Sequence, residues 1–188
     1  RTVKNDKQLV QIRRELDSNL FKPKVRQVTH KLALVDVLNE NDIKLAVEAS
    51  SATDAIRVAA EPLVEQGAIS QNYVEKMVSP DDEHALSAYI ISPCVALPHS
   101  NPENGAKKVA IGMTVLKSPV TFGKMENEKV RFIFVLSAVN PTDHLMVLQD
   151  LMDLLADNHF MSLLVSPKTN VQDVLRYLRE KSKPKLKG

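Results

Sequence analysis

Two histidines stand where an α/β protein could use them for chemistry. His99 follows a short apolar stretch and Pro98, and residues 100–105 after it are typical of a loop. His144 lies in the first turn of a predicted helix that follows the most apolar predicted strand. Because strand ends and helix N-termini gather at one edge of such a sheet, we expect the two imidazoles to face each other there.

Such a pair suits phosphoryl transfer. A neutral imidazole is a good nucleophile towards phosphorus, and its ordinary pKa of about 6.5 leaves it mostly neutral near pH 7. A phosphorylated histidine carries a dianion, which helix amides, a positive helix end and a second imidazole could bind without a metal ion. The alternative is that each histidine is structural, because the spacing of the pair is not specific in itself.

The elements that would position these histidines alternate along the chain. Strands are predicted over 43–47, 89–91, 95–97, 108–116 and 129–139, and helices over 51–66, 70–78, 141–155, 159–165 and 171–177. This alternation predicts the α/β class. The last strand is nearly continuously apolar from Phe132, which is typical of a central strand. The helix after it repeats Leu145, Leu148, Met152 and Leu155, which we expect to form its buried face.

The composition is that of a globular protein of ordinary size. The chain has 188 residues, of which 44% are hydrophobic and 26% charged. A net charge of +2 does not favour binding to nucleic acid or to a membrane surface. The single cysteine, Cys94, excludes an internal disulfide and fits a reducing, cytoplasmic compartment. No apolar run reaches the roughly 18–20 residues that a membrane span needs.

The chain divides by composition into two parts. Residues 1–31 are polar and basic, and they predict a short helix and a linker that belong to an upstream region. Residues 32–188 hold the predicted compact domain and end in a basic tail. Because the chain starts with Arg1, we interpret it as a piece of a longer polypeptide, although a trimmed tag would look the same.

Other reactive side chains have plainer explanations. We expect Cys94 to be a small buried hydrophobe rather than a reactive thiol. His84 follows three acidic residues, which favours a solvated loop over a metal site. Met146 and Met152 fit core packing, although a methionine near the histidines could also belong to an apolar docking patch. No metal site or cofactor is predicted.

Five blocks of the sequence together resemble a known family. They are residues 73–77, 93–105, which contain the run Ala-Leu-Pro-His ending at His99, 116–123, 138–139 and 144–145. In this order they resemble the enzyme IIA domain of the mannitol/fructose superfamily of the sugar phosphotransferase system (PTS). The resemblance spans residues 32–180 and is nearest to the ascorbate-type branch and to the IIA-like domains of transcription regulators with PTS regulation domains (PRDs). It implies a mixed β-sheet covered by helices on both faces.

The resemblance also implies roles for particular residues. His99 would carry a phosphoryl group that the phosphocarrier HPr donates and that a IIB domain or protein accepts. His144 would hydrogen-bond the first imidazole or its phosphate. Ser100, Asn101 and Lys108 would form the surroundings of the phosphate.

Two positions depart from the pattern of that branch. Cys94 stands where glycine is usual, and Asn101 stands where arginine is usual. The loss of the arginine removes a phosphate partner, for which Lys107 or Lys108 could substitute. The Arg–Glu pair of more distant mannitol-type members also has no arginine counterpart in residues 78–82. We expect phosphorylation to be retained, because both histidines are present, and to be weaker or adapted to signalling.

Three functions fit these observations. Residues 1–31 favour the first, a C-terminal regulatory domain of a sugar-responsive transcription regulator or antiterminator, with PRD and nucleic-acid-binding domains upstream. The second is a free-standing, sugar-specific IIA component that passes phosphate to a IIB protein during carbohydrate uptake. The third is an inactive IIA-like interaction module, which the loss of the arginine keeps open. In each case we expect a cytoplasmic domain without membrane insertion.

Overall fold

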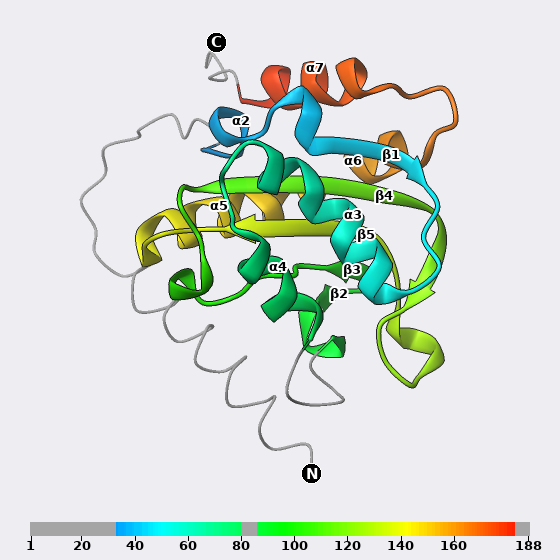
Figure 1. Cartoon of the computed structure of the whole chain (residues 1–188). Helices are drawn as coiled ribbons and strands as arrows, with labels where there is room; N and C mark the ends of the chain where they lie inside the picture. Colours follow the sequence, from blue (N-terminus) through cyan, green and yellow to red (C-terminus); the bar gives the residue numbers. More distant parts are fainter. Residues whose placement is uncertain (1–32, 80–85, 183–188) are drawn as a thin grey trace, which may run out of the picture. The chain divides into compact units, whose positions relative to one another are not determined.

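The computed structural model describes residues 33–79 and 86–182 of the chain (Figure 1). Within these ranges five strands form one sheet in the order β1-β4-β5-β3-β2. They are β1 (Ile43–Val47), β2 (Ile90–Ser92), β3 (Cys94–Ala96), β4 (Ala110–Thr121) and β5 (Lys129–Ser137). The β1–β4 and β3–β5 pairs are parallel, whereas β4–β5 and β2–β3 are antiparallel. The sheet is therefore mixed, as the resemblance implied.

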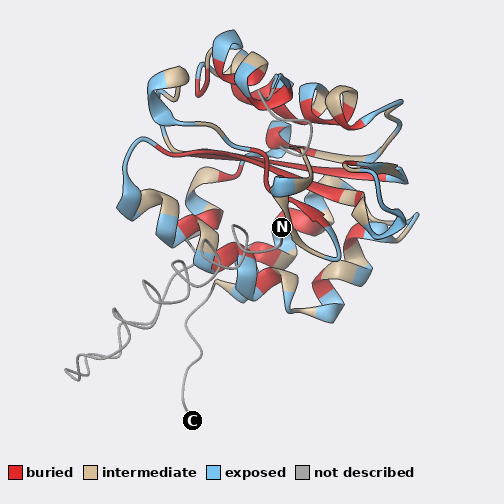
Figure 2. Ribbon diagram, turned by 90° about the horizontal axis from the view of Figure 1, so that it is seen from below, coloured by how far each residue is buried: buried red, intermediate tan, exposed pale blue. Residues whose placement is uncertain are grey.

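Helices cover both faces of this sheet. One face carries α2 (Ala33–Val37), α5 (Pro141–Leu155), α6 (Asn158–Val165) and α7 (Val171–Lys181), and the other carries α3 (Ala52–Glu65) and α4 (Gln71–Val78). Figure 2 shows the strands as a buried layer between exposed helix surfaces. The predicted α/β class and its two covered faces are confirmed. None of the helices in the described ranges is long and apolar enough to cross a membrane.

The side chains of β5 show why this strand is central. Phe132, Phe134 and Leu136 pack into the core under α5, α6 and α7. Ile133 and Val135 pack into the core under α3 and α4. Because successive side chains of a strand point to opposite faces, a strand covered on both sides is apolar on both, as β5 is from Phe132 to Leu136. The prediction of a central strand is confirmed.

The helix starts follow from polar N-cap residues. The side chains of Ser51, Ser70, Asn140 and Asn170 each accept a hydrogen bond from a backbone N–H in the first turn of the helix that follows. These residues cap α3, α4, α5 and α7, and each predicted helix range begins at its cap or directly after it. The caps fix where α4 and α5 begin, and both helices start close to the chain that leads to His99.

The predicted buried face of α5 is right for Leu148 and Leu155, which are partly buried against the core, and wrong for Leu145 and Met152. Val147, Leu151 and Leu154 are the buried apolar residues of the helix, whereas Leu145 and Met152 are 40% and 44% exposed. The predicted stripe lies one residue further along the chain, which turns it about 100° around the helix axis. Since α5 is apolar over much of its circumference, periodicity alone did not distinguish the two stripes.

A buried carboxylate explains which face of α5 turns inward. Asp150 is fully buried and accepts a hydrogen bond from the Leu34 N–H of α2 at 3.0 Å. This bond joins α2 to α5. A prediction of the buried face from apolar residues alone does not include Asp150. Met146 is 41% exposed, so the prediction that Met146 and Met152 pack in the core is also wrong.

The bounds of β2, β3, β4 and β5 differ from the prediction by one to five residues, and two of these strands show why. β2 begins at Ile90 because Tyr89 closes a short 3-10 turn, Ser87–Tyr89. β4 starts two residues later than expected and continues past Pro119, because the register shifts after Val115 and pairing with β5 resumes at Val120. A proline has no N–H for the ladder, and a register shift is a position where the sheet tolerates one.

Cys94 is not a buried hydrophobe, so that prediction is wrong. It is exposed, opens β3 at a register shift, and has a φ angle of +65°. Such a left-handed backbone conformation suits glycine, because other L-residues crowd their Cβ against the carbonyl oxygen. Glycine, which the resemblance implies at this position, would adopt this conformation without that crowding.

We expect Cys94→Gly to stabilise the domain by about 0.5–1 kcal/mol, because relief of the left-handed conformation exceeds the added flexibility of the unfolded chain. Urea denaturation measures the difference. Cys94→Ala is the control, since alanine removes the thiol but keeps the Cβ. Equal stability of the two variants would show that the backbone conformation costs nothing.

Candidate functional site

The two histidines lie at one edge of the sheet. The parallel strands β3 and β5 end at this edge. His99 follows β3 by three residues, and α5 begins four residues after β5, which places His144 in the first turn of the helix. His99 is exposed and His144 is partly buried. The structure thus brings together the pair that the sequence proposed.

The His99 ring lies between two other rings. Its centroid is 5.9 Å from that of His144, and the two planes meet at 66° in an edge arrangement. On another side, the Tyr89 ring lies 5.9 Å away at an angle of 58°. These neighbours restrict how the His99 ring can turn.

One hydrogen bond decides which nitrogen of His99 is free. Nδ1 lies 2.8 Å from the carbonyl oxygen of Leu97. Because a carbonyl oxygen can only accept, Nδ1 must carry the proton. In the neutral ring Nε2 then holds the free lone pair, which makes Nε2 the nucleophilic atom.

The surroundings of His144 favour its neutral form. Burial lowers the pKa of the His144 imidazole below its ordinary value, and the nearby His99 lowers that pKa further. A neutral imidazole has one donor and one acceptor nitrogen. His144 can therefore lie beside His99 without charge repulsion.

The loop after His99 is tied to the start of α4. The Ser100 hydroxyl accepts a hydrogen bond from Asn104 Nδ2 at 2.8 Å, and the Asn104 carbonyl accepts from the Ser70 hydroxyl at 3.2 Å. Gly105 has a φ of +128°, and a Cβ at this position would lie 1.8 Å from Ser70 Oγ. The close contact between loop and helix therefore requires glycine.

The other predicted phosphate-site residues lie at the same edge with exposed side chains. The Asn101 carbonyl accepts the Asn104 N–H at 3.0 Å, while its side chain faces solvent. The Lys108 carbonyl accepts from the hydroxyl of Ser137, the last residue of β5, at 2.8 Å. The backbone of Lys108 is thus fixed beside the end of β5, and its exposed ammonium group is free of the core.

Cys94 and the remaining metal-ligating residue types do not join the site. Cys94 begins β3, whereas His99 follows the other end of that strand. No three His, Cys, Asp or Glu side chains gather as a metal site within residues 33–79 and 86–182. His84 and His30 lie outside the described residues, as do the predicted helix and linker of 1–31 and the end of the basic tail.

His159 belongs to a separate cluster between α6 and α7. It is exposed, and its ring stacks on that of Tyr177 with the centroids 5.5 Å apart. Asp157 caps α6 and accepts the Tyr177 hydroxyl at 2.6 Å. The Lys181 ammonium group and the Tyr177 hydroxyl hold the pKa of the Asp157 carboxyl well below its usual range. This cluster joins two helices and does not contribute to the histidine pair.

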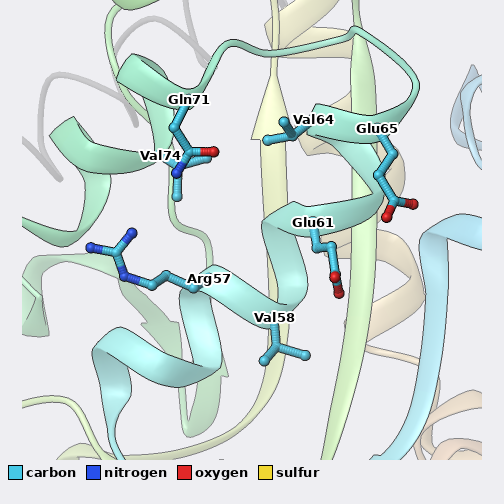
Figure 3. A pocket seen from close by; sticks show the side chains of 7 residues that line it. All are labelled: Arg57, Val58, Glu61, Val64, Glu65, Gln71 and Val74. Atoms are coloured by element: carbon cyan, nitrogen blue, oxygen red, sulfur yellow. The ribbon is translucent and has the colours of Figure 1, made fainter.

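A surface pocket of about 310 Å³ lies along α3 and α4, as Figure 3 shows. It is lined by Arg57, Val58, Glu61, Val64, Glu65, Gln71 and Val74. Arg57 is bonded to Glu75 by two parallel hydrogen bonds of 2.6 and 3.0 Å, and Glu61 accepts from Lys44 at 2.6 Å. None of the predicted site residues lines this pocket.

Comparison with known proteins agrees with this geometry. The family model described as "Phosphoenolpyruvate-dependent sugar phosphotransferase system, EIIA 2" matches residues 36–181. The chain belongs to this family. SgcA of Escherichia coli strain K12, named for a phosphotransferase IIA component, is 36% identical over 115 residues, or 58% of this chain and 78% of SgcA. An ascorbate-specific PTS EIIA component of Shigella boydii is 29% identical over 114 residues, or 60% and 73% of the two chains.

Solved structures of IIA domains have the same fold. The mannitol-specific cryptic enzyme IIA CmtB of Escherichia coli matches with a TM-score of 0.67 and 26% identity, over 78% of this chain and 98% of CmtB. The mannitol IIA chain of Escherichia coli, solved in complex with phosphorylated IIB, matches with a TM-score of 0.62 and 27% identity, over 76% and 97% of the two chains. The predicted family and fold class are confirmed.

Two tyrosines near His99 were missed as site residues. Tyr73 lies in a block that carries the resemblance, between Asn72 and Val74, but it was given no role of its own. Tyr89 was placed in a strand. Each has a phenol whose hydroxyl bonds a main-chain oxygen, of Leu136 and Met77 respectively. A buried phenol needs a hydrogen-bond partner, but the sequence around Tyr73 is mostly polar and does not show that this side chain is buried.

We expect the pKa of His144, measured by NMR titration, to lie below about 6.5 and to rise in the His99→Ala variant, which removes both a cover and a neighbouring charge. Because the folded-state pKa is lowered, the contribution of His144 to stability is present above about pH 6.5 and is lost as the pH falls towards the folded pKa. A His144 pKa above 6.5 in the unaltered protein would contradict this description of the site.

Proposed function

We propose that this IIA domain accepts a phosphoryl group from phosphorylated HPr on Nε2 of His99 and passes it to a IIB domain or protein during sugar uptake. The observation that carries the proposal is the bond from Nδ1 to the Leu97 carbonyl, which leaves Nε2 as the nucleophile beside His144. The mannitol IIA–IIB complex supports IIB as the acceptor. The relatives are named for ascorbate and for mannitol, so the proposal concerns the phosphoryl relay and not one sugar.

The transfer exchanges one N–P bond for another. The Nε2 lone pair attacks the phosphorus on the donor histidine, and the electron pair of the breaking N–P bond returns to the donor imidazole. The His99 ring then bears positive charge while its Nδ1 keeps the proton. A hydrogen bond from a charged ring is stronger than one from a neutral ring, so the Leu97 carbonyl stabilises the phosphorylated form more than the free form.

The phosphoryl dianion needs donors, which the site supplies without an arginine at Asn101. The arriving negative charge raises the pKa of His144, so this imidazole gains a proton when it is most useful. The Ser100 oxygen accepts from Asn104, which leaves the hydroxyl proton available to a phosphate oxygen. The exposed Lys108 ammonium group can approach from the same edge of the sheet.

The surface beside His144 suits a docking partner. Val139, Leu145 and Met146 are each about two-fifths exposed (43%, 40% and 41%) and lie on either side of His144 in the chain. Apolar side chains grouped on an exposed surface mark protein contacts. We propose that these three side chains form a patch that contacts the phosphorylated HPr donor, which must bring its own histidine to His99.

Regulation through the same histidine is the second candidate. It rests on residues 1–31, which lie outside the described residues, and would place PRD and nucleic-acid-binding domains upstream. The two functions differ in the fate of the phosphoryl group, since an uptake component delivers it to IIB and a regulator retains it. Incubating the phosphorylated domain with IIB proteins separates them. In both functions the relay would operate in the cytoplasm.

Phosphorylation by phosphoenolpyruvate, enzyme I and HPr should add one acid-labile phosphoryl group, detected by mass spectrometry. His99→Ala should abolish this gain because it removes the nucleophile. His144→Ala should slow it by about tenfold to a hundredfold through loss of a donor to the phosphate. His159→Ala, at a remote exposed histidine, should react normally. Label that persists in His99→Ala would overturn the assignment, and an unlabelled wild-type protein would indicate an inactive module.

Met146→Ser should raise the KM for phosphorylated HPr about fivefold and leave kcat unchanged, because it removes about 1 kcal/mol of apolar burial from the encounter. Steady-state phosphorylation at varied HPr concentration measures both constants. Met125→Ser is the matched control. Met125 is 62% exposed in the turn before β5, at the opposite end of this strand from the site. Equal KM values for the two variants would exclude the patch as the docking surface.

A further inference from the structure

The residues on both sides of His99 are fastened to one residue of β5. The Leu136 N–H donates to the Pro98 carbonyl at 3.0 Å. On the other side, the Ser100 N–H donates to the Tyr73 hydroxyl oxygen at 3.0 Å, and that hydroxyl lies 2.8 Å from the Leu136 carbonyl. The regular pairing of β3 with β5 ends at Ala96, and one further backbone bond joins Leu136 to Pro98. Beyond that bond the two backbones separate, and the Tyr73 hydroxyl bridges Ser100 and Leu136.

The Tyr73 hydroxyl is held where it stands. The side chain is 1% exposed and packs into the core between the sheet and helices α3 and α4. Burial raises the pKa of the Tyr73 phenol, so it keeps its proton and can act as a donor. The Ser100 carbonyl is a second acceptor at 3.1 Å, but the Leu136 carbonyl is nearer. The phenol therefore accepts from the loop that follows β3 and donates to Leu136 near the end of β5.

We propose that Tyr73 is a positioning residue for His99. By fixing the Ser100 amide, it holds the backbone on the far side of His99 at the angle that lets Nδ1 reach the Leu97 carbonyl at 2.8 Å. Tyr73 acts through Ser100 and does not touch the reacting nitrogen. Its effect on phosphorylation rests on the function proposed above, whereas its effect on the His99 tautomer does not.

The physical argument is one of buried polar groups. Without the phenol oxygen, the Ser100 N–H and the Leu136 carbonyl both lose a partner inside the protein. The loop then gains by moving so that these groups meet water, and such a movement carries His99 away from Leu97. Small displacements of a reacting group are costly, because a shift of about 1 Å can lower a rate a hundredfold.

The test compares Tyr73→Phe with Tyr177→Phe in the full chain. Both remove one hydroxyl and its hydrogen bond, but the Tyr177 hydroxyl bonds Asp157 in the cluster between α6 and α7. Nitrogen-15 NMR of the histidine rings reports whether Nδ1 or Nε2 of His99 carries the proton. We expect wild type and Tyr177→Phe to have the proton on Nδ1, and Tyr73→Phe to show a mixture of the two tautomers.

Kinetics provide the second readout. In Tyr73→Phe we expect kcat for phosphorylation to fall about tenfold while the KM for phosphorylated HPr stays within twofold, because the docking surface is intact. A His99 tautomer in Tyr73→Phe identical to that of the wild type would overturn the proposal. If the wild-type protein accepts no phosphoryl group, the proposed function fails, and the tautomer comparison still decides the role of Tyr73.

A third measurement covers the case in which Tyr73→Phe does not fold. Hydrogen exchange at the Ser100 amide of the unaltered chain reports the bond to Tyr73 directly. Strong protection of this loop amide supports the proposal, since its partner is the phenol oxygen. Exchange at the rate of an unstructured peptide would overturn it.

Discussion

The parallel pairing of β3 and β5 is the constraint on which the site depends. It ends both strands at one edge of the sheet, so the chain after β3 delivers His99 to the place where α5 begins with His144. Leu136 of β5 extends the pairing beyond the regular strand, because its N–H and its carbonyl hold the backbone before and after His99. The imidazole of His99 is exposed, while hydrogen bonds to Leu136 and Tyr73 hold the backbone on both sides of it. The ring is therefore accessible from solvent and still has a defined orientation.

The carbonyl of Leu97 gives that orientation a chemical consequence. It takes the Nδ1 proton and directs the lone pair of His99 to Nε2. It would also bind more strongly to a ring that bears positive charge, which is the state of His99 after the phosphorylation that we propose. The partly buried His144 would also interact more strongly with a phosphorylated ring. The pKa of its imidazole is lowered in the free site, and an incoming dianion would raise that pKa. In the function that we propose, His144 would then donate to the phosphate that an arginine at Asn101 would otherwise bind.

Much of this arrangement could be predicted from the sequence. Capping residues fixed the helix starts at Ser51, Ser70 and Asn140, and continuous apolar character identified β5 as central. The two histidines were paired because each stood beside such a boundary. These predictions succeeded because the signals are local, and a cap or an apolar run depends on few residues outside itself.

The errors have physical causes that are not local. The buried face of α5 depends on the Leu34 N–H that Asp150 accepts, more than a hundred residues away along the chain. Cys94 is exposed at a register shift, where the backbone is left-handed. A cysteine in the sequence does not indicate such a backbone conformation, whereas a glycine would. The role of Tyr73 depends on three chain segments that meet at one phenol oxygen. Interactions of this kind become visible only when the sheet order is known.

The Leu97 carbonyl commits Nδ1 of His99 to a hydrogen bond, which leaves Nε2 as the atom that we propose takes the phosphoryl group. The most direct measurement is NMR of the phosphorylated, nitrogen-15-labelled domain, in which coupling between phosphorus and nitrogen identifies the bonded atom. The account predicts coupling to Nε2 of His99, with Nδ1 still protonated. Coupling to Nδ1 of His99, or to a nitrogen of any other histidine, would contradict it.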